Sequence, residues 1–151
     1  MSTMERTLVI LKPDAVQRRL CGKILQTFED KGFKIIGMKM MIIPRELAEK
    51  HYEAHREKPF YESLLGFMTA GPVIFFALEG ARAVEVVRKM MGKTFGFDAE
   101  PGTIRGDYGI SNQFNLIHGS DSAEAAEHEL SLFFNPEELY TYDMMDDSWM
   151  N

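Results

Sequence analysis

One histidine and one glutamate have the residue types and the spacing that nucleophilic catalysis needs. His118 closes the apolar run "NLIH" and stands before Gly119, where a ligand or a backbone can approach closely. Glu129 falls four residues after Ala125 and four before Phe133, on the inward flank of the helix expected there, so its carboxylate could reach one imidazole nitrogen. A carboxylate in that place fixes the tautomer and leaves the lone pair of the other nitrogen free to attack. The plainer alternative, more common for a lone histidine, is that His118 is structural and Glu129 is a surface charge.

Three cationic side chains are placed in the sequence so that they could bind one anion together. Lys12 directly follows an apolar run, Arg88 falls on the core-facing flank of its helix, and Arg105 sits in "PGTIRGD" between turn glycines. With the hydroxyl groups of Tyr52 and Thr94, these cations could bind a polyphosphate. Each cation alone is more often a solvated surface charge, so the prediction depends on the whole set.

Three segments resemble known motifs but fail on spacing. "GKT" at 92–94 is not a P-loop, because Val87 stands where that motif needs its first glycine and a helix precedes it. "HYEAH" at 51–55 has its glutamate in the middle, whereas zinc proteases need it directly after the first histidine, so no protein-held metal is expected. Ser120 and Ser122 lack the G-x-S-x-G elbow, and helix capping explains both.

Composition narrows the classes of function. The chain has 151 residues, 45% of them apolar, and a formal net charge of −6, which argues against general binding to nucleic acid or anionic membranes. Its apolar runs, such as "VIFFAL", fall far short of the roughly 20 residues of a membrane span, and the first residues lack a signal-peptide pattern. The lone Cys21 cannot form an intrachain disulfide, which fits a reducing compartment. We therefore expect a cytoplasmic protein with one domain over residues 1–151 and a C-terminal extension from about residue 135.

The elements that must position these residues follow from the apolar pattern. Strands are predicted at 7–11, 33–43, 73–79 and 114–118, and helices at 22–32, 44–57, 60–68, 81–92 and 122–134. Pro13 suits the first turn of a helix, and Asp121 with Glu124 forms a plausible capping box. Residues 93–112 show no period and are predicted to be a functional loop. This order predicts an α/β (α+β) sandwich, ferredoxin-like βαββαβ, whose antiparallel four-stranded sheet is covered by helices.

Four segments together resemble the nucleoside diphosphate kinases: "LKPDAV", "HYEAHREKPF", "PGTIRGDYG" and "NLIHGSDS". The likeness runs in order from about residue 5 to about residue 140. It implies a ping-pong transfer of the terminal phosphoryl from a nucleoside triphosphate, such as ATP or GTP, to a nucleoside diphosphate through a phosphohistidine. It also implies that Mg²⁺ arrives bound to the nucleotide, so that no protein metal site is needed.

The resemblance implies a role for each matching residue. His118 would be the nucleophile and Glu129 its orienting partner. Lys12 and Asn115 would bind the ribose hydroxyls, with Lys12 also near the transferred phosphoryl. Residues that would hold or lie near the phosphates are Tyr52, His55, Arg88, Thr94 and Arg105. The base would lie against Phe60 and Leu64, with Asn112 opposite.

Three positions depart from the pattern of this family. Asn112 replaces an apolar residue, often valine, which bears on one face of the base site. Phe114 replaces an arginine and Gly96 a proline, which bear on loop rigidity and subunit packing. Relatives assemble as hexamers or smaller oligomers; a hexamer is favoured here, and Tyr140, Tyr142 and Trp149 could cover a neighbouring subunit. The competing functions are a nucleotide-binding or nucleic-acid-binding regulator without turnover and a phosphotransfer partner of another protein.

Overall fold

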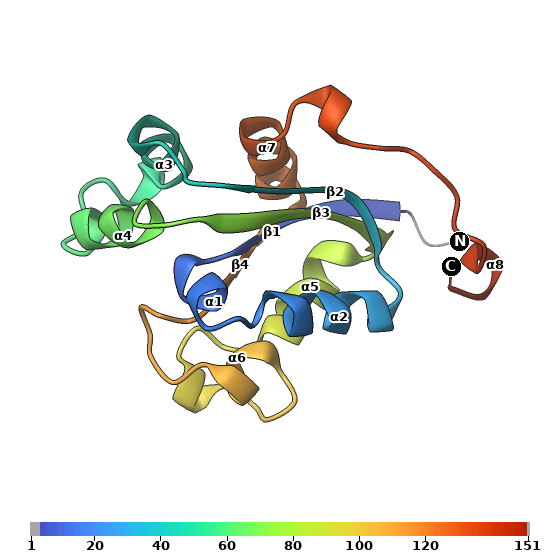
Figure 1. The fold of residues 1–151 in the computed structure, drawn as a ribbon, viewed down its shortest axis with the longest axis horizontal. Coiled ribbons are helices and arrows are strands. Elements are labelled where there is room, and N and C mark those ends of the chain that lie inside the picture. The colour runs from blue at the N-terminus through green and yellow to red at the C-terminus, as the bar shows by residue number, and fades with distance from the viewer. Residues whose placement is uncertain (1–3, 151) are drawn as a thin grey trace.

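A four-stranded antiparallel sheet forms the centre of the computed structural model, which describes residues 4–150 (Figure 1). Its strands are β1 (Met4–Leu11), β2 (Lys34–Met41), β3 (Val73–Ala81) and β4 (Ile117–Gly119), in the order β2-β3-β1-β4. All three neighbouring pairs are antiparallel. The predicted ferredoxin-like α+β sandwich is therefore confirmed.

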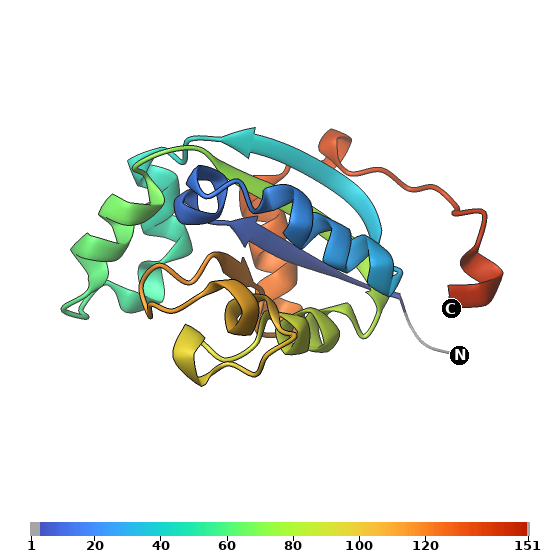
Figure 2. The same ribbon diagram turned by 60° about the horizontal axis from the view of Figure 1, so that its bottom comes forward.

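Helices cover both faces of the sheet because its central strands are apolar on both sides. In β1, Leu8 and Ile10 pack into one buried cluster, whereas Val9 and Leu11 pack into the other. The first cluster lies under α3 (Arg45–His51), α4 (Tyr61–Met68) and α7 (Ala123–Phe133). The second lies under α1 (Pro13–Gln17), α2 (Cys21–Lys31) and α5 (Ala83–Met91), and Figure 2 shows α2 lying across that face.

Local signals set most helix ends where the sequence predicts them. Pro13 is the first residue of α1, and Gly32 ends α2 with a φ of 104°, a conformation that glycine adopts without strain. The capping box predicted for Asp121 and Glu124 is wrong. The N-cap of α7 is Ser122, whose hydroxyl accepts a hydrogen bond from the amide of Ala125 at 3.0 Å.

Two segments differ in detail from the predicted elements. The helix predicted over 44–57 ends at His51 and continues as a 3₁₀ turn, η1 (Glu53–His55). The segment 93–112 contains a second 3₁₀ turn, η2 (Gly96–Asp98), and a short helix, α6 (Ile104–Tyr108). A Cβ at position 96 would lie 2.3 Å from the carbonyl carbon of Gly109, so this close approach requires glycine.

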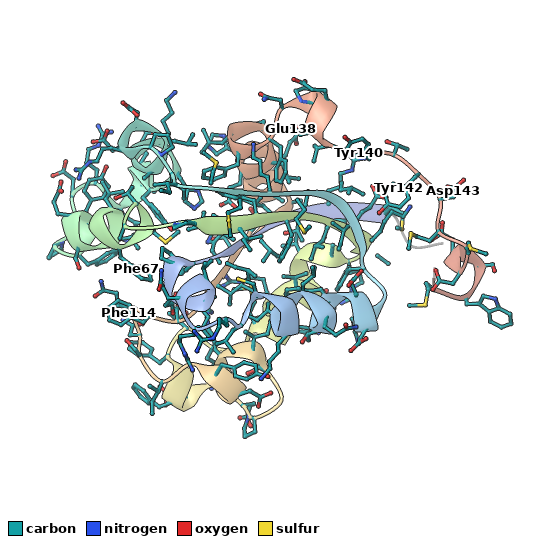
Figure 3. The ribbon with its side chains drawn as sticks, viewed as in Figure 1. Phe67, Phe114, Glu138, Tyr140, Tyr142 and Asp143 are labelled. Carbon is teal, nitrogen blue, oxygen red and sulfur yellow. The ribbon has the colours of Figure 1, made fainter. Side chains whose placement is uncertain are left out.

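The C-terminal segment lies along the edge strand β2 of its own chain. After η3 (Pro136–Glu138), the amide of Tyr140 donates to the carbonyl of Ile36 at 2.8 Å, and the hydroxyl of Tyr142 donates to the carbonyl of Ile35. Figure 3 shows Tyr140 and Tyr142 on this path, which ends in α8 (Asp147–Met150). Tyr140 contacts β2 through its backbone and Tyr142 through its hydroxyl, and both side chains remain exposed, so their role in covering a neighbouring subunit stays a prediction. Among the residues described, no helix combines the length and apolar character of a membrane span.

Candidate active site

His118 projects from the middle of β4, the shortest strand of the sheet. Its Cα pairs with that of Ile10 in β1, so the position of the imidazole is set by the centre of the fold. The side chain is 23% exposed, which leaves one edge of the ring open to a ligand. Behind it, Gly119 lets Met91 of α5 pack close, since a Cβ there would lie 2.5 Å from the methionine sulfur.

Glu129 of α7 reaches His118 as the sequence predicts. Its Oε1 lies 2.9 Å from Nε2 of the imidazole and also accepts a hydrogen bond from the hydroxyl of Ser120 at 2.7 Å. Burial acts to raise the pKa of Glu129, but these two hydrogen bonds and the nearby imidazole outweigh it and lower the pKa. The carboxylate therefore stays charged, occupies Nε2 and leaves Nδ1 as the nitrogen that can act as a nucleophile.

Ser120 is a site residue whose role the sequence interpretation missed. Helix capping seemed to explain it, yet Ser122 provides the cap, and Ser120 is fully buried with its hydroxyl on Glu129. One pattern could have identified it: in β4 and its continuation, residues 118 and 120 project to the same face of the sheet.

His51 is a second residue that the sequence interpretation missed, because "HYEAH" was tested only as a metal motif. Its ring stands edge-on to that of His118, with centroids 4.9 Å apart, and contacts Phe133 at 5.1 Å. Burial, followed by the nearby His118, lowers the pKa of His51 to about 3, so the ring is neutral. Both of its nitrogens are buried and find no hydrogen-bond partner within residues 4–150.

Ligand atoms of His51, His118 and Glu129 lie within 4.8 Å of one another, which raises the question of a metal ion. Zinc holds nitrogen and oxygen ligands at about 2.0 to 2.2 Å, so two ligand atoms on one ion lie no more than about 4.4 Å apart. A limit of 4.8 Å lies only slightly above this value, but an ion would compete with the hydrogen bond between His118 and Glu129. The absence of a protein-held metal therefore stays a prediction.

Lys12 and Asn115 form a polar pair at the ends of β1 and of the loop before β4. Nζ of Lys12 donates to Oδ1 of Asn115 at 2.7 Å, and Nδ2 of Asn115 donates to the carbonyl of Thr94 at 3.1 Å. Burial, then the positive charge of Arg105, lowers the pKa of Lys12 to about 8, although Asp14 acts to raise it. The structure thus brings Lys12, Thr94 and Asn115 together, as the resemblance implies.

The two arginines occupy different environments. Arg105 is 5% exposed, and its guanidinium donates to the carbonyls of Gly92, Asn115 and Ile117 at 3.2, 3.2 and 2.6 Å. Burial and the neighbouring Arg88 lower its pKa to about 10. Arg88 is exposed, donates to the carbonyl of Gly119 at 3.4 Å, and borders a hollow of about 800 Å³. Arg105 therefore supports the backbone on both sides of Leu116, while Arg88 is the freer cation.

A row of rings leads outward from His118. His51, Tyr52, His55 and Phe60 follow one another with centroid separations of 4.4, 6.4 and 5.5 Å. Tyr52 is buried, and burial raises the pKa of its hydroxyl, whereas the Phe60 ring at the outer end is 49% exposed. The structure thus connects three predicted residues, Tyr52, His55 and Phe60, to the nucleophile through His51.

The loop that carries Asn112 is tied to α4, which carries Leu64. The ring of Phe114 meets Phe67 edge-on with centroids 5.1 Å apart (Figure 3), and Nε2 of Gln113 donates to the hydroxyl of Ser63 at 3.1 Å. Phe114, expected to affect loop rigidity and subunit packing, therefore contacts α4 of its own chain. Asn112 itself is exposed and directly precedes Gln113 and Phe114.

Comparisons with known proteins agree with this geometry. Residues 5–139 match the family model described as nucleoside diphosphate kinase. The chain belongs to the nucleoside diphosphate kinase family. Nucleoside diphosphate kinases from Pyrococcus horikoshii and Thermomicrobium roseum are 61% and 54% identical to it, over 94% and 97% of this chain and 92% and 99% of theirs. A solved halophilic nucleoside diphosphate kinase from Halobacterium salinarum, in complex with CDP, has a TM-score of 0.95 and 49% identity, and the match covers 97% of this chain and 98% of that one.

As a nucleoside diphosphate kinase, the protein transfers the terminal phosphoryl of a nucleoside triphosphate to a nucleoside diphosphate by a ping-pong mechanism. In a ping-pong mechanism the first product leaves before the second substrate binds, so the enzyme itself must carry the phosphoryl. The carrier must therefore be a nucleophilic side chain of the protein.

Proposed function

We propose that Nδ1 of His118 carries the phosphoryl between the two half-reactions. The observation that supports this is the position of Glu129, which accepts the proton of Nε2 and so leaves the Nδ1 lone pair free. In the first half-reaction, Nδ1 forms a bond to the terminal phosphorus while the bond to the bridging oxygen breaks, and the diphosphate leaves with both electrons of that bond. The second half-reaction reverses these steps with a different diphosphate, so atoms and charge balance.

Glu129 and Ser120 act as the orienting pair in this proposal. The imidazole becomes positively charged as it attacks, and a carboxylate 2.9 Å away stabilises that charge in place. Ser120 donates to the same carboxylate oxygen and so fixes its rotamer. The neutral His51 ring packs edge-on against His118 and limits how far the nucleophile can turn.

Nucleotide binding is assigned to the residues that the resemblance implies. Lys12 and Asn115 take the ribose hydroxyls, and Lys12 also lies near the transferred phosphoryl. The phosphates contact Tyr52, His55, Arg88, Thr94 and Arg105. Mg²⁺ enters with the nucleotide and neutralises charge on the phosphate oxygens, which phosphoryl transfer requires. Phosphates entering the site would also raise the pKa of Lys12 and restore its charge.

The base site is proposed between the outer ring of the row and the loop opposite. Phe60 stacks on the base, Leu64 packs beside it, and Asn112 faces it from the loop. Since every base has a π-face, stacking on Phe60 discriminates little between bases. We therefore expect all common nucleoside diphosphates to serve, with purines ahead of pyrimidines.

The chain is proposed to act in the cytoplasm as one domain over residues 1–151, with an extension from about residue 135, and to assemble as a hexamer. The exposed edge of β2 supports assembly, since Met38, Met40 and Ile42 are 58%, 57% and 59% exposed there. An edge strand with a row of apolar side chains is a natural surface for another subunit. Light scattering that gave a monomer at micromolar concentration would refute the assembly.

The decisive experiment mixes the protein with ATP, Mg²⁺ and GDP and measures GTP. With ATP and Mg²⁺ alone, the protein should gain one phosphoryl that is acid-labile and alkali-stable, as a phosphoramidate is. A His118→Ala variant should gain none and form no GTP, while a His128→Ala variant, which changes an exposed histidine on α7, should behave as wild type. Full labelling of His118→Ala, or label on serine, would refute the assignment.

A further inference from the structure

Leu116, two residues before His118, has a backbone conformation that side chains rarely adopt. Its φ is 75°, in the left-handed region, although its side chain is fully buried in the core. Arg19 and Arg82 also have a positive φ, but both are exposed, whereas Leu116 is buried. A buried leucine persists in it only where the surrounding structure holds it there, and such positions cluster at functional sites.

The turn between β1 and α1 holds both backbone groups of Leu116. The amide of Leu116 donates to Oδ2 of Asp14 at 3.1 Å, and its carbonyl accepts from the amide of Lys12 at 2.8 Å. The second bond is between backbone groups and does not depend on a side chain. The amide of Ile117 also donates to the carbonyl of Asn115 at 2.9 Å, across Leu116, and Arg105 donates to the carbonyls on either side. Asp14 is the side chain that bonds a backbone group of Leu116 itself, so its carboxylate is the contact chosen for substitution.

The environment of Asp14 does not suit a simple surface charge. Its other oxygen, Oδ1, is buried and finds no hydrogen-bond partner within the described part of the chain. Burial raises the pKa of Asp14, while Lys12 and the amides of Asp14, Leu116 and Ala15 act to lower it. A carboxylate kept in such a place has a structural task there, since partial burial without full hydrogen bonding is unfavourable.

We propose that Asp14 is a positioning residue, whose hydrogen bond holds Leu116 in the left-handed conformation and thereby sets where Asn115 and His118 project. The inference rests on the proposed role of His118. Without this bond, Leu116 relaxes toward extended backbone, which rotates the peptide group that precedes it. Asn115 then leaves the position in which its Oδ1 accepts a hydrogen bond from Nζ of Lys12 at 2.7 Å. The direction in which the chain enters β4 also changes.

The test compares three substitutions of Asp14 that separate its charge from its hydrogen bond. Asp14→Asn keeps an acceptor at the same distance and loses the charge, Asp14→Glu keeps the charge but displaces the acceptor, and Asp14→Ala loses both. Asp30→Ala is the matched control, because the carboxylate of Asp30 likewise accepts a hydrogen bond, here from the side chain of Gln26 at 2.7 Å, on the exposed face of α2. The readouts are the single-turnover rate of His118 phosphorylation at saturating ATP, the Kd for ADP, and hydrogen exchange of the Leu116 amide.

We expect the rate of His118 phosphorylation in Asp14→Asn to lie within about threefold of the wild-type rate. In Asp14→Glu and Asp14→Ala this rate should be lower by about 10-fold or more, in line with the cost of a left-handed residue. The two slow variants should also bind ADP more weakly and lose protection of the Leu116 amide. Should Asp14→Ala fail to fold, the difference in rate between Asp14→Asn and Asp14→Glu tests the proposal. The proposal would be overturned if Asp14→Asn and Asp14→Glu were phosphorylated at equal rates, or if Asp14→Asn were slow and Asp14→Glu fast. If wild type formed no phosphohistidine, the proposed function would fall, and amide exchange at Leu116 would still test the positioning.

Discussion

The two ends of the proposed site are held by different kinds of contact. Around His118, the imidazole is oriented by hydrogen bonds that run from Ser120 through Glu129 and by the neutral His51 ring packed edge-on against it. Around the base, the contacts are between exposed or half-exposed rings, such as Phe67 with Phe114 and His55 with Phe60. Phosphoryl transfer needs one fixed geometry, whereas a base site that accepts several bases needs surface area with little directional bonding. Variants at the two ends should therefore fail in different kinetic parameters.

At the nucleophile end, Glu129→Gln should give the largest effect. The amide keeps the size and one acceptor, but it loses the charge that stabilises the imidazolium. We expect phosphorylation at saturating ATP to slow by about 10- to 100-fold, the size of effect seen when the carboxylate partner of a metal-binding histidine is removed, with the Kd for ADP unchanged. Rapid-quench labelling measures the rate. Unchanged turnover would show that the charge of Glu129 has no part in the phosphorylation of His118.

Next in size is the pH dependence of nucleotide affinity that Lys12 should produce. Its pKa is lowered to about 8, so its charge is present below that pH and is lost as the pH rises through it. The Kd for ADP in the free enzyme should therefore increase above pH 8, by up to about 10-fold per pH unit. Lys12→Arg, whose guanidinium stays charged, should remove this dependence. A wild-type Kd that stayed constant to pH 9.5 would contradict the expectation.

At the base end, Phe114→Ala should weaken nucleotide binding without slowing the chemistry. Losing the edge-on contact with Phe67 frees the loop of Asn112, and the Kd for ADP should rise about 3- to 10-fold. Ribose 5′-triphosphate, which has no base, should phosphorylate the variant and wild type equally. Phe97→Ala is the control, since it removes an exposed ring whose ring contact is with Phe95. If Phe114→Ala showed a defect of the same size with the base-free substrate, Phe114 would not act through binding of the base.

The smallest effect is expected from Asn112→Val. An amide in an exposed loop competes with water for the base edge, so its preference for one base should be slight. Second-order rates for adenine, guanine, cytosine and uracil diphosphates should stay within roughly a factor of 100 in wild type and change about threefold or less in the variant. One base preferred by many thousandfold, and lost on substitution, would reveal a specific edge contact.

Local signals in the sequence predicted much of the fold and the central pair of the site. Apolar runs located all four strands, and helical spacing alone placed Glu129 on the face that meets His118. The predicted strand at 114–118 begins only at Ile117, because Leu116 leaves the extended region, and that conformation depends on a bond to Asp14, distant in sequence. His51, tested only within a metal motif, was missed because its contact with His118 exists only in the folded chain, where α3 packs against α7. The acceptors of the Arg105 guanidinium could not be predicted either, because backbone carbonyls carry no sequence signal.

The C-terminal segment lies almost entirely beyond the match to the family model, which ends at residue 139, and the site residues proposed here all precede it. Its contacts with Ile35 and Ile36 take up hydrogen-bonding groups at one half of the β2 edge, leaving Met38 and Met40 at the other half. A protease that removed residues 139–151 would thus spare the chemistry and uncover the whole edge. An uncovered, apolar edge strand is a template for pairing with other chains, so we expect the truncated chain to keep its chemistry but to aggregate more readily than the full chain.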